Sequence, residues 1–221
     1  MDNLLDGLNP AQRDAVTSPA SVLQVLAPPG SGKTKTLTAR VAYLISHEHL
    51  RAWNIIVCTF TRKSAEGMRQ RIRGFVGKEI ASNLILGTFH SVALRFLQAY
   101  GDKIGIRTPV GVAETDDSKA IIKRIVDRHK YTIEPKIARS RISGLKCKGI
   151  TAGEFYAKNV KKAEQHEFAA IYTEYEEILK AENLLDYDDI LLRCTELLKI
   201  YPQCVSTIEA VLIDEYQVSL R

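Results

Sequence analysis

The sequence predicts an α/β fold in which a parallel sheet is covered by helices and interrupted by an all-helical insertion. Apolar runs without polar alternation are typical of strands buried on both faces of such a sheet. The chain holds four such runs, at Val22–Leu26, Ile55–Cys58, Leu84–Leu86 and Val211–Ile213. Helix-length patterns separate the first three runs, and this strand–helix order is typical of layered α/β proteins.

Two helices are expected between these strands, at Lys33–Ser46 and Lys63–Val76. In the second, apolar residues recur three or four positions apart, so they share one stripe along the helix. The stripe consists of Ala65, Met68, Ile72 and Phe75. We therefore expect these four side chains to face the core.

The helical insertion is predicted from the segment between about Asp116 and Tyr201, where apolar residues keep helical spacing and no strand-like run occurs. The pattern is clearest in Phe168–Glu182, which reads as an amphipathic helix. The chain accordingly divides into residues 1–109 as the first part of the core, residues 110–184 as the insertion, and residues 185–221 as the return to the core.

Composition narrows the class of protein. Of the 221 residues, 45% are hydrophobic and 26% charged, as in ordinary soluble globular proteins. No apolar run approaches the roughly 20 residues that span a bilayer, and residues 1–10 do not resemble a secretory signal. The four cysteines lack the spacing of a zinc site or a disulfide framework. We expect an intracellular protein without a membrane partner, nuclear in a eukaryote and otherwise cytoplasmic.

Positive charge is concentrated between Lys119 and Glu164, which hold 13 Lys and Arg against 4 Asp and Glu. The rest of the chain holds 18 basic and 22 acidic residues, so this segment alone makes the net charge positive, at +5. A concentrated basic region favours a polyanionic partner, with nucleic acid before an acidic membrane surface. Charge alone leaves open a solvated basic helix surface without a ligand.

A phosphate-binding loop is predicted where the first apolar run meets the first helix. Its residues are Ala27, Pro28, Pro29, Gly30, Ser31, Gly32, Lys33 and Thr34, with Ala27 in place of the first glycine of the strict pattern. Gly30 and Gly32 allow successive N–H groups to turn toward phosphate oxygens, and the helix adds its positive dipole end. Lys33 would reach the β- and γ-phosphates of ATP, and the Thr34 hydroxyl would bind Mg²⁺.

An acidic pair at the end of the fourth run indicates the chemistry of this site. Asp214 and Glu215 follow Val211–Ile213 directly, and ligands of open α/β sheets bind at the carboxyl ends of strands. Asp214 could hold Mg²⁺ through water, while Glu215 could orient or deprotonate the attacking water. Acid pairs after strands are common, so this pair indicates a metal site only in combination with the phosphate loop.

These segments resemble the UvrD/Rep-type superfamily 1 DNA helicases, in order along the whole chain. Leu8–Arg13 is similar to the Q motif, which implies that Gln12 reads adenine; an amide can bond both N6 and N7 of that base. Without the resemblance, Gln12 is a surface helix residue. Asp214–Gln217 resembles the DExQ quartet, which implies that Glu215 and Gln217 position water. The resemblance implies a RecA-like phosphate-loop NTPase core that uses ATP and Mg²⁺.

Two further segments resemble motifs that contact single-stranded DNA. Thr59–Ala65 is similar to motif Ia, which implies stacking of Phe60 on a base. It also implies DNA contacts from Thr59, Thr61, Arg62 and Lys63, although the family usually has asparagine where Arg62 stands. Gly87–Ser91 is similar to motif Ib, which implies that His90 faces DNA. From the residues alone, Phe60 could equally belong to the core and His90 could be structural.

The resemblance identifies the insertion with the family's second, helical subdomain, which implies contacts with single strands and duplex junctions. Leu184–Ile190 is similar to the segment that returns the chain to the core. In the family, a strand that follows DExQ lies between the strands of the phosphate loop and the acid pair. We therefore expect a gap of roughly 9.6 Å between those two strands here, or an inward shift of Val211–Ile213. We also expect these 221 residues to be the first third of a helicase, or a short isoform.

Three functions compete. The leading one is the ATP- and single-stranded-DNA-binding portion of a 3′–5′ DNA helicase that couples ATP hydrolysis to translocation. The second is a non-catalytic module that binds ATP and DNA without turnover. A different phosphate-loop enzyme, such as a small kinase, is disfavoured, because the Ia, Ib and DExQ segments have no reason to occur there in this order. The sequence does not identify protein partners.

Overall fold

The computed structural model describes residues 4–159 and 163–216, which divide into two compact units. The first unit consists of residues 4–92 and 205–216, and the second of residues 93–204. The insertion predicted at residues 110–184 lies inside the second unit, while the three domain bounds themselves stay a prediction. Within the described residues, no helix has the length and apolar character needed to cross a bilayer.

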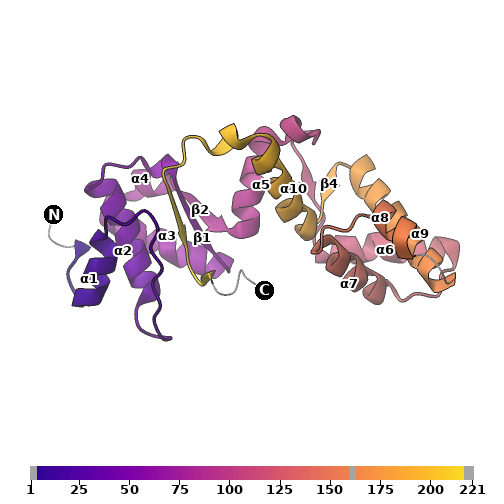
Figure 1. Ribbon diagram of the computed structural model, residues 1–221, viewed down its shortest axis with the longest axis horizontal. Helices are drawn as coiled ribbons and strands as arrows, with labels where there is room; N and C mark the ends of the chain where they lie inside the picture. The colour runs from indigo at the N-terminus through magenta and orange to yellow at the C-terminus, as the bar shows by residue number, and fades with distance from the viewer. Residues whose placement is uncertain (1–3, 160–162, 217–221) are drawn as a thin grey trace. The chain divides into compact units, whose positions relative to one another are not determined.

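The first unit is built on a three-stranded parallel sheet. Its strands are β1 (Ile55–Thr59), β2 (Ile85–Thr88) and β5 (Ala210–Ile213), and β1 lies between the other two (Figure 1). Its helices are α1 (Pro10–Thr17), α2 (Lys33–Ser46), α3 (Arg62–Val76), α4 (Lys78–Ser82) and the start of α5 (Phe89–Tyr100), with a 3-10 turn η2 (Ala52–Asn54) before β1. Three of the four predicted strands are thus confirmed, with bounds that differ by one or two residues.

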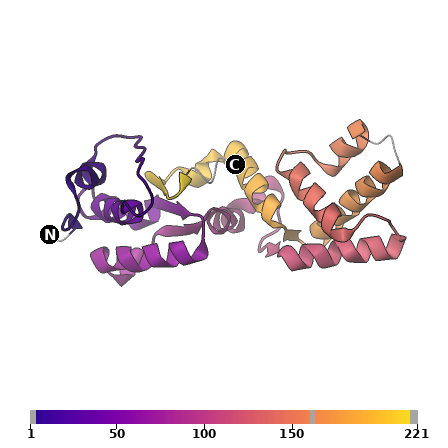
Figure 2. The same cartoon turned by 90° about the horizontal axis from the view of Figure 1, so that it is seen from below.

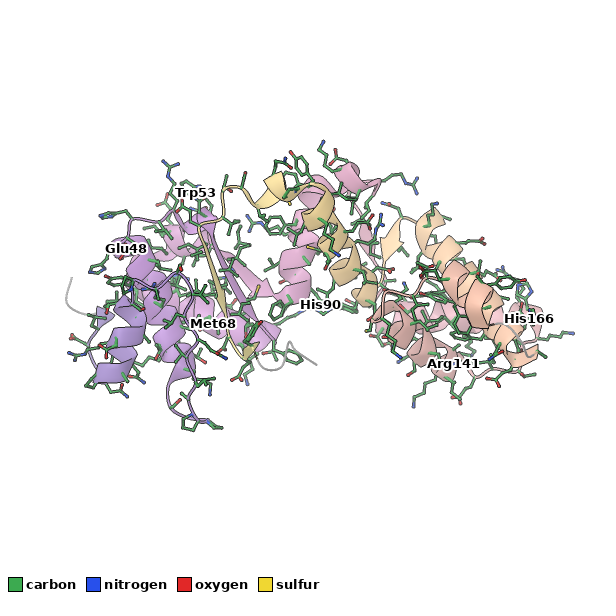
Figure 3. The ribbon with its side chains drawn as sticks, viewed as in Figure 1. Glu48, Trp53, Met68, His90, Arg141 and His166 are labelled. Carbon is green, nitrogen blue, oxygen red and sulfur yellow. The ribbon has the colours of Figure 1, made fainter. Side chains whose placement is uncertain are left out.

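The core of the first unit lies between the sheet and the pair α2 and α3. Val41 of α2 and Met68 of α3 are fully buried against Ile55 and Val57 of β1 (Figure 3 labels Met68). The predicted stripe of α3 is confirmed at three positions, but Phe75 is 42% exposed. Its neighbour in the last turn of the helix, at position 76, packs against the core instead.

The strand predicted at Val22–Leu26 is wrong. These residues form an irregular segment, and the exposed fractions of Val22 and Leu26 are 89% and 83%. A strand needs a hydrogen-bonded neighbour, and no described residue pairs with this run. The outer edge of β5 is likewise unpaired among the described residues, and Val211 is 58% exposed.

The second unit is mostly helical. Its elements are the end of α5, η3 (Gly101–Ile104), β3 (Gly111–Val112), α6 (Thr115–His129), α7 (Pro135–Lys146), α8 (Ala152–Asn159), α9 (Ala163–Ala181), β4 (Leu184–Leu185), α10 (Tyr187–Ile200) and η4 (Pro202–Val205). The expectation that no strand occurs here is wrong, because β3 and β4 form a two-residue parallel pair. So short a pair carries no sequence pattern of its own.

Helices α6, α7, α8 and α9 gather around one core (Figures 1 and 2). The fully buried side chains of α6 are Ile122 and Ile125, which meet Phe168 and Ile171 of α9 in that core. Phe155 of α8 meets the ring of Phe168 edge-on, with 5.0 Å between ring centroids. The amphipathic helix predicted over Phe168–Glu182 is confirmed, although α9 begins five residues earlier.

Candidate nucleotide site and DNA-facing edge

The phosphate loop joins the irregular segment at residues 22–26 to α2. Gly30 and Gly32 have φ angles of 77° and 88°, in the left-handed region that favours glycine. Gly32 caps the N-terminus of α2, and its carbonyl accepts a hydrogen bond of 2.9 Å from the Thr36 N–H. The loop therefore has the backbone form that turns N–H groups toward an anion at the positive end of a helix.

Two side chains of the loop fit a phosphate ligand. The Lys33 Nζ donates to the carbonyl oxygens of Ala27, at 3.0 Å, and Pro28, at 3.2 Å. These neutral acceptors can be exchanged for phosphate oxygens, with which an ammonium group forms stronger bonds. The Ser31 Oγ is buried and has no hydrogen-bond partner among the described residues, and phosphate oxygens would supply one.

The loop and the acid pair meet at Thr34 and Asp214. The Thr34 side chain lies close enough to the Asp214 carboxylate to lower its pKa, so these two residues are neighbours although residues 22–26 form no strand. Asp214 is 7% exposed at the carboxyl end of β5, and its N–H donates to the Cys58 carbonyl at 2.9 Å. β5 pairs with β1 on one side and with no described residue on the other, so the predicted inward shift of Val211–Ile213 onto the phosphate-loop strand is not observed.

Burial raises the pKa of Asp214 above its ordinary value, and the neighbouring charge of Glu215 adds to the increase. The Lys33 ammonium and the Thr34 side chain lower that pKa instead. Glu215 has a φ of 54°, an uncommon value for a residue with a side chain. Gln217, predicted to position water, lies outside the described residues.

Gln12 is tied to the phosphate loop. Its Nε2 donates to the Ser31 carbonyl at 2.9 Å, and its Oε1 accepts from the Asn9 N–H at 3.0 Å. Asn9 in turn accepts from the Gln12 N–H at 2.9 Å, which completes a capping box for α1. Gln12 is thus a half-buried residue of α1 whose side chain holds the loop, and its contact with adenine stays a prediction.

The segments that resemble motifs Ia and Ib lie at one edge of the sheet. Thr59 pairs in register with Thr88, and both end their strands, so the following segments start side by side. Parallel sheets bind ligands at this carboxyl edge. Asp214 follows the third strand at the same edge.

Phe60 is 61% exposed, so the alternative that it belongs to the core is wrong. Thr61 caps α3 by accepting a 3.0 Å bond from the Ser64 N–H. Arg62 and Lys63 are exposed in the first turn of that helix, whereas Thr59 is only 1% exposed. The surface at this point therefore consists of a free ring beside two cations and a helix N-terminus.

In the segment similar to motif Ib, His90 lies half-buried in the first turn of α5 (Figure 3). The turn is held by Ser91, whose Oγ donates to the Thr88 carbonyl at 2.9 Å. A Cβ at Gly87 would lie 2.2 Å from that Oγ, so only glycine fits beside it. His90 has interactions of its own within the structure.

The basic segment 119–164 is partly neutralised. Besides Lys146, three of its cations form ion pairs of 2.8–2.9 Å: Lys119 with Asp116, Arg128 with Glu174, and Arg141 with Glu164. Others are exposed and make no ion pair with a described residue, among them Lys123, Arg124, Lys136 and Lys148. The helical unit thus presents free cations on α6 and α7.

Lys146 belongs to a buried ion cluster that the sequence analysis missed. It is 3% exposed, and its Nζ lies 2.7 Å from Glu176 and 2.8 Å from both Asp186 and Asp189. The Tyr175 hydroxyl donates to Asp186 at 3.0 Å. A signal was present: the buried residues of α7 are spaced by four, at positions 138, 142 and 146, and the last of them is this lysine.

The chain is similar in sequence to known proteins over nearly its whole length. Residues 8–219 match the family model "UvrD/REP helicase N-terminal domain". The chain is 38% identical over 231 residues to "ATP-dependent DNA helicase srs2" of Schizosaccharomyces pombe, covering 95% of this chain and 26% of that protein. It is 35% identical over 228 residues to "ATP-dependent DNA helicase UvrD1" of Mycobacterium tuberculosis, with 98% and 29% covered.

A third relative is "ATP-dependent DNA helicase PcrA" of Bacillus subtilis, 31% identical over 223 residues, with 98% of this chain and 30% of that protein covered. The chain thus spans between 26% and 30% of the length of these three relatives. Nearly all of its residues fall within the matched family model. The chain belongs to the UvrD/Rep helicase family, in its N-terminal domain.

Proposed function

We propose that this chain is the ATP- and single-stranded-DNA-binding part of a 3′–5′ DNA helicase, with a RecA-like core interrupted by a helical insertion at residues 110–184. The observation that carries the proposal is the meeting of the phosphate loop, through Thr34, with Asp214 at the carboxyl edge of the sheet. Family membership supports it. Because the chain spans under a third of its relatives, unwinding is proposed for the whole protein and not for this part.

In this proposal, the loop N–H groups and Lys33 hold the phosphates of ATP, with Ser31 as a further donor. Thr34 and Asp214 hold the accompanying Mg²⁺, which neutralises phosphate charge when bound. Glu215 and Gln217 orient water toward the γ-phosphate. Gln12 reads adenine, and its bond to the Ser31 carbonyl supports a position beside the nucleotide.

DNA binding is proposed at the edge where β1 and β2 end. Phe60 stacks on a base, as its exposed ring supports, while Thr61, Arg62 and Lys63 contact phosphates. Buried Thr59 and half-buried His90 would line this edge. The free cations of α6 and α7 add contacts with duplex junctions. A protein with this substrate acts inside the cell, in the nucleus of a eukaryote and otherwise in the cytoplasm.

A nucleotide titration with and without a single-stranded oligothymidylate tests the proposal. We expect a fluorescent ATP analogue with Mg²⁺ to bind, and the oligonucleotide to change its affinity. Binding of both ligands without turnover under any condition would favour the non-catalytic module, and DNA-independent phosphoryl transfer would favour another phosphate-loop enzyme. No binding of nucleotide to the folded chain would contradict the proposed site altogether.

A further inference from the structure

The outward face of α9 borders an open hollow that the nucleotide and DNA sites do not use. The hollow has a volume of about 1080 Å³ and lies entirely within the second unit. Its floor is a stripe of small residues at helical spacing, Ala163, Ala170 and Thr173. We call this hollow the α9 groove.

One wall of the α9 groove is fixed by hydrogen bonds from the end of α6 and the turn after it. Glu174 of α9 lies 2.8 Å from both Arg128 and His129 of α6. Glu167 accepts from the hydroxyl of Thr132 at 2.8 Å and also from its N–H. Because these bonds join the wall to the floor, the groove is pre-organised.

Aromatic rings stand on both sides of the groove. On the α6 side, Tyr131 stacks on His129 with 5.1 Å between ring centroids. On the α8 side, Tyr156 meets His166 edge-on at 6.2 Å and is 57% exposed (Figure 3 labels His166 on α9). Exposed rings that are rigidly held beside carboxylates bind cations through their π faces.

The charge of the groove is opposite to that of its surroundings. Its lining contains four glutamates, at positions 164, 167, 174 and 177; Arg141 neutralises Glu164 and Arg128 neutralises Glu174, so Glu167 and Glu177 remain as uncompensated negative charges. Yet most of this lining belongs to the basic segment 119–164 or directly follows it. Glu177 is exposed and has no ion pair with a described residue. A phosphate backbone would be repelled here, whereas a cationic chain would be attracted.

We propose that the α9 groove binds a Lys- or Arg-bearing segment of a partner protein. The small residues of the floor admit the segment, a guanidinium or ammonium group lies against Tyr156, and Glu177 pairs with a second cation. The helical unit thereby presents a basic surface on α6 and α7 and an acidic one in the α9 groove. DNA on the first surface would not repel a cationic protein segment on the second. This inference does not depend on the nucleotide site.

Fluorescence anisotropy of a labelled peptide of alternating arginine and alanine, added to the 221-residue chain, tests the proposal. We expect Tyr156→Ala to weaken peptide binding about threefold to thirtyfold, because a cation–π contact is lost. Glu177→Lys should weaken it at least about fivefold, because one ion pair becomes a repulsion. Glu182→Lys is the matched control: it makes the same charge change at the end of α9, outside the groove lining, and should leave peptide affinity nearly unchanged.

Far-UV circular dichroism of each variant establishes that it is folded, and oligothymidylate binding is measured in parallel. The proposal is overturned if the peptide does not bind, or if Glu182→Lys weakens it as much as Glu177→Lys does. It is also overturned if Tyr156→Ala lowers oligothymidylate affinity as strongly as peptide affinity, because the groove would then be a nucleic-acid surface. Sedimentation provides the last comparison: a dimer that Glu177→Lys dissociates, without peptide binding, would make a second copy of the chain the occupant.

Discussion

The ammonium group of Lys33 in the first unit donates to two backbone carbonyls, whereas that of Lys146 in the second unit lies within 2.8 Å of three carboxylates. Burial alone would lower the pKa of Lys146, but its three partners raise it well above the ordinary value. Lys33 is in contrast only partly buried, and its carbonyl partners are neutral. The partners of Lys33 are weak acceptors that a phosphate ligand can replace. Those of Lys146 are charged and hold the helices of the second unit together.

The same contrast extends to the carboxylates. Burial would raise the pKa of Asp186, but Lys146 outweighs burial and holds it below the ordinary value. Burial raises the pKa of Asp189 to about 7, because the Lys146 charge does not offset the lost hydration and the nearby charges of Asp186 and Glu176. Asp214, by comparison, has its pKa raised mainly by burial, with a cation nearby rather than in contact. The Lys146 cluster is therefore suited to stabilising the fold, whereas the surroundings of Asp214 are suited to binding a further cation.

The largest expected effect is on stability. Lys146→Met should lower the free energy of unfolding of the second unit by about 3–5 kcal/mol, because buried carboxylates lose their counter-charge. Denaturant unfolding followed by circular dichroism measures the loss. The only tryptophan, Trp53, lies in the first unit, so its fluorescence reports that unit separately.

Lys148→Met is the control, because it removes an exposed lysine two residues away. It should change stability by less than about 0.5 kcal/mol. If Lys146→Met were as harmless as Lys148→Met, the cluster would not hold the second unit together, and the comparison with Lys33 would lose its basis.

Lys33→Ala should lower the affinity for ATP and leave the stability of the protein unchanged, the reverse of Lys146→Met. We expect ATP binding to weaken by about 2–3 kcal/mol or more, because charge-assisted bonds to phosphate are lost. The unfolding transition without nucleotide should stay where it is, since only two exchangeable bonds to carbonyls disappear. Isothermal titration calorimetry with ATP and Mg²⁺ gives the affinity, and Lys35→Ala on the same helix is the control. Unchanged affinity in a folded Lys33→Ala protein would refute the phosphate-loop assignment.

Phe60→Ala tests whether an exposed side chain at the carboxyl edge of the sheet contributes to DNA binding and not to stability. Loss of one stacked base should weaken binding of a single-stranded oligonucleotide by about 1–3 kcal/mol, with stability unchanged because the ring is 61% exposed. Phe75→Ala, near the other end of α3, removes a ring that is 42% exposed and should leave DNA affinity unaltered. Equal losses in both variants would mean that Phe60 acts through the helix and not through a base.

The sequence was most informative where local chemistry determines structure. The phosphate loop depends on glycines at two left-handed positions, and α2 was predicted with the bounds that the structure has, Lys33–Ser46. Val22–Leu26 shows the limit: its apolar pattern is that of a buried strand, but pairing depends on a neighbour that no described residue supplies. Lys146 was missed because a lysine in a basic segment looks solvated until its distant partners, Asp186 and Asp189, are known.

The last expected effect is a dependence of stability on pH, and it is set by Asp189. Its pKa is about 7 in the folded chain and 3.8 ordinarily, so between these values the folded chain binds more protons than the unfolded chain. The free energy of unfolding should therefore fall as pH rises from about 4 to 7, by at most about 1.4 kcal/mol per pH unit. Asp186 acts in the opposite sense, because its lowered pKa gives stability that is lost as pH falls below its ordinary value.

Asp189→Asn should remove the decline between pH 4 and 7, since an amide does not titrate but can still accept a hydrogen bond from Lys146. Urea unfolding at a series of pH values, followed by circular dichroism, measures the slope. Asp127→Asn, on the exposed face of α6, changes the same charge and should leave the slope in place. If the decline persisted in Asp189→Asn, the excess proton would belong to Glu176 or to another group. Lys146 would still have three carboxylate partners, but the protonated member of the cluster would then be a residue other than Asp189.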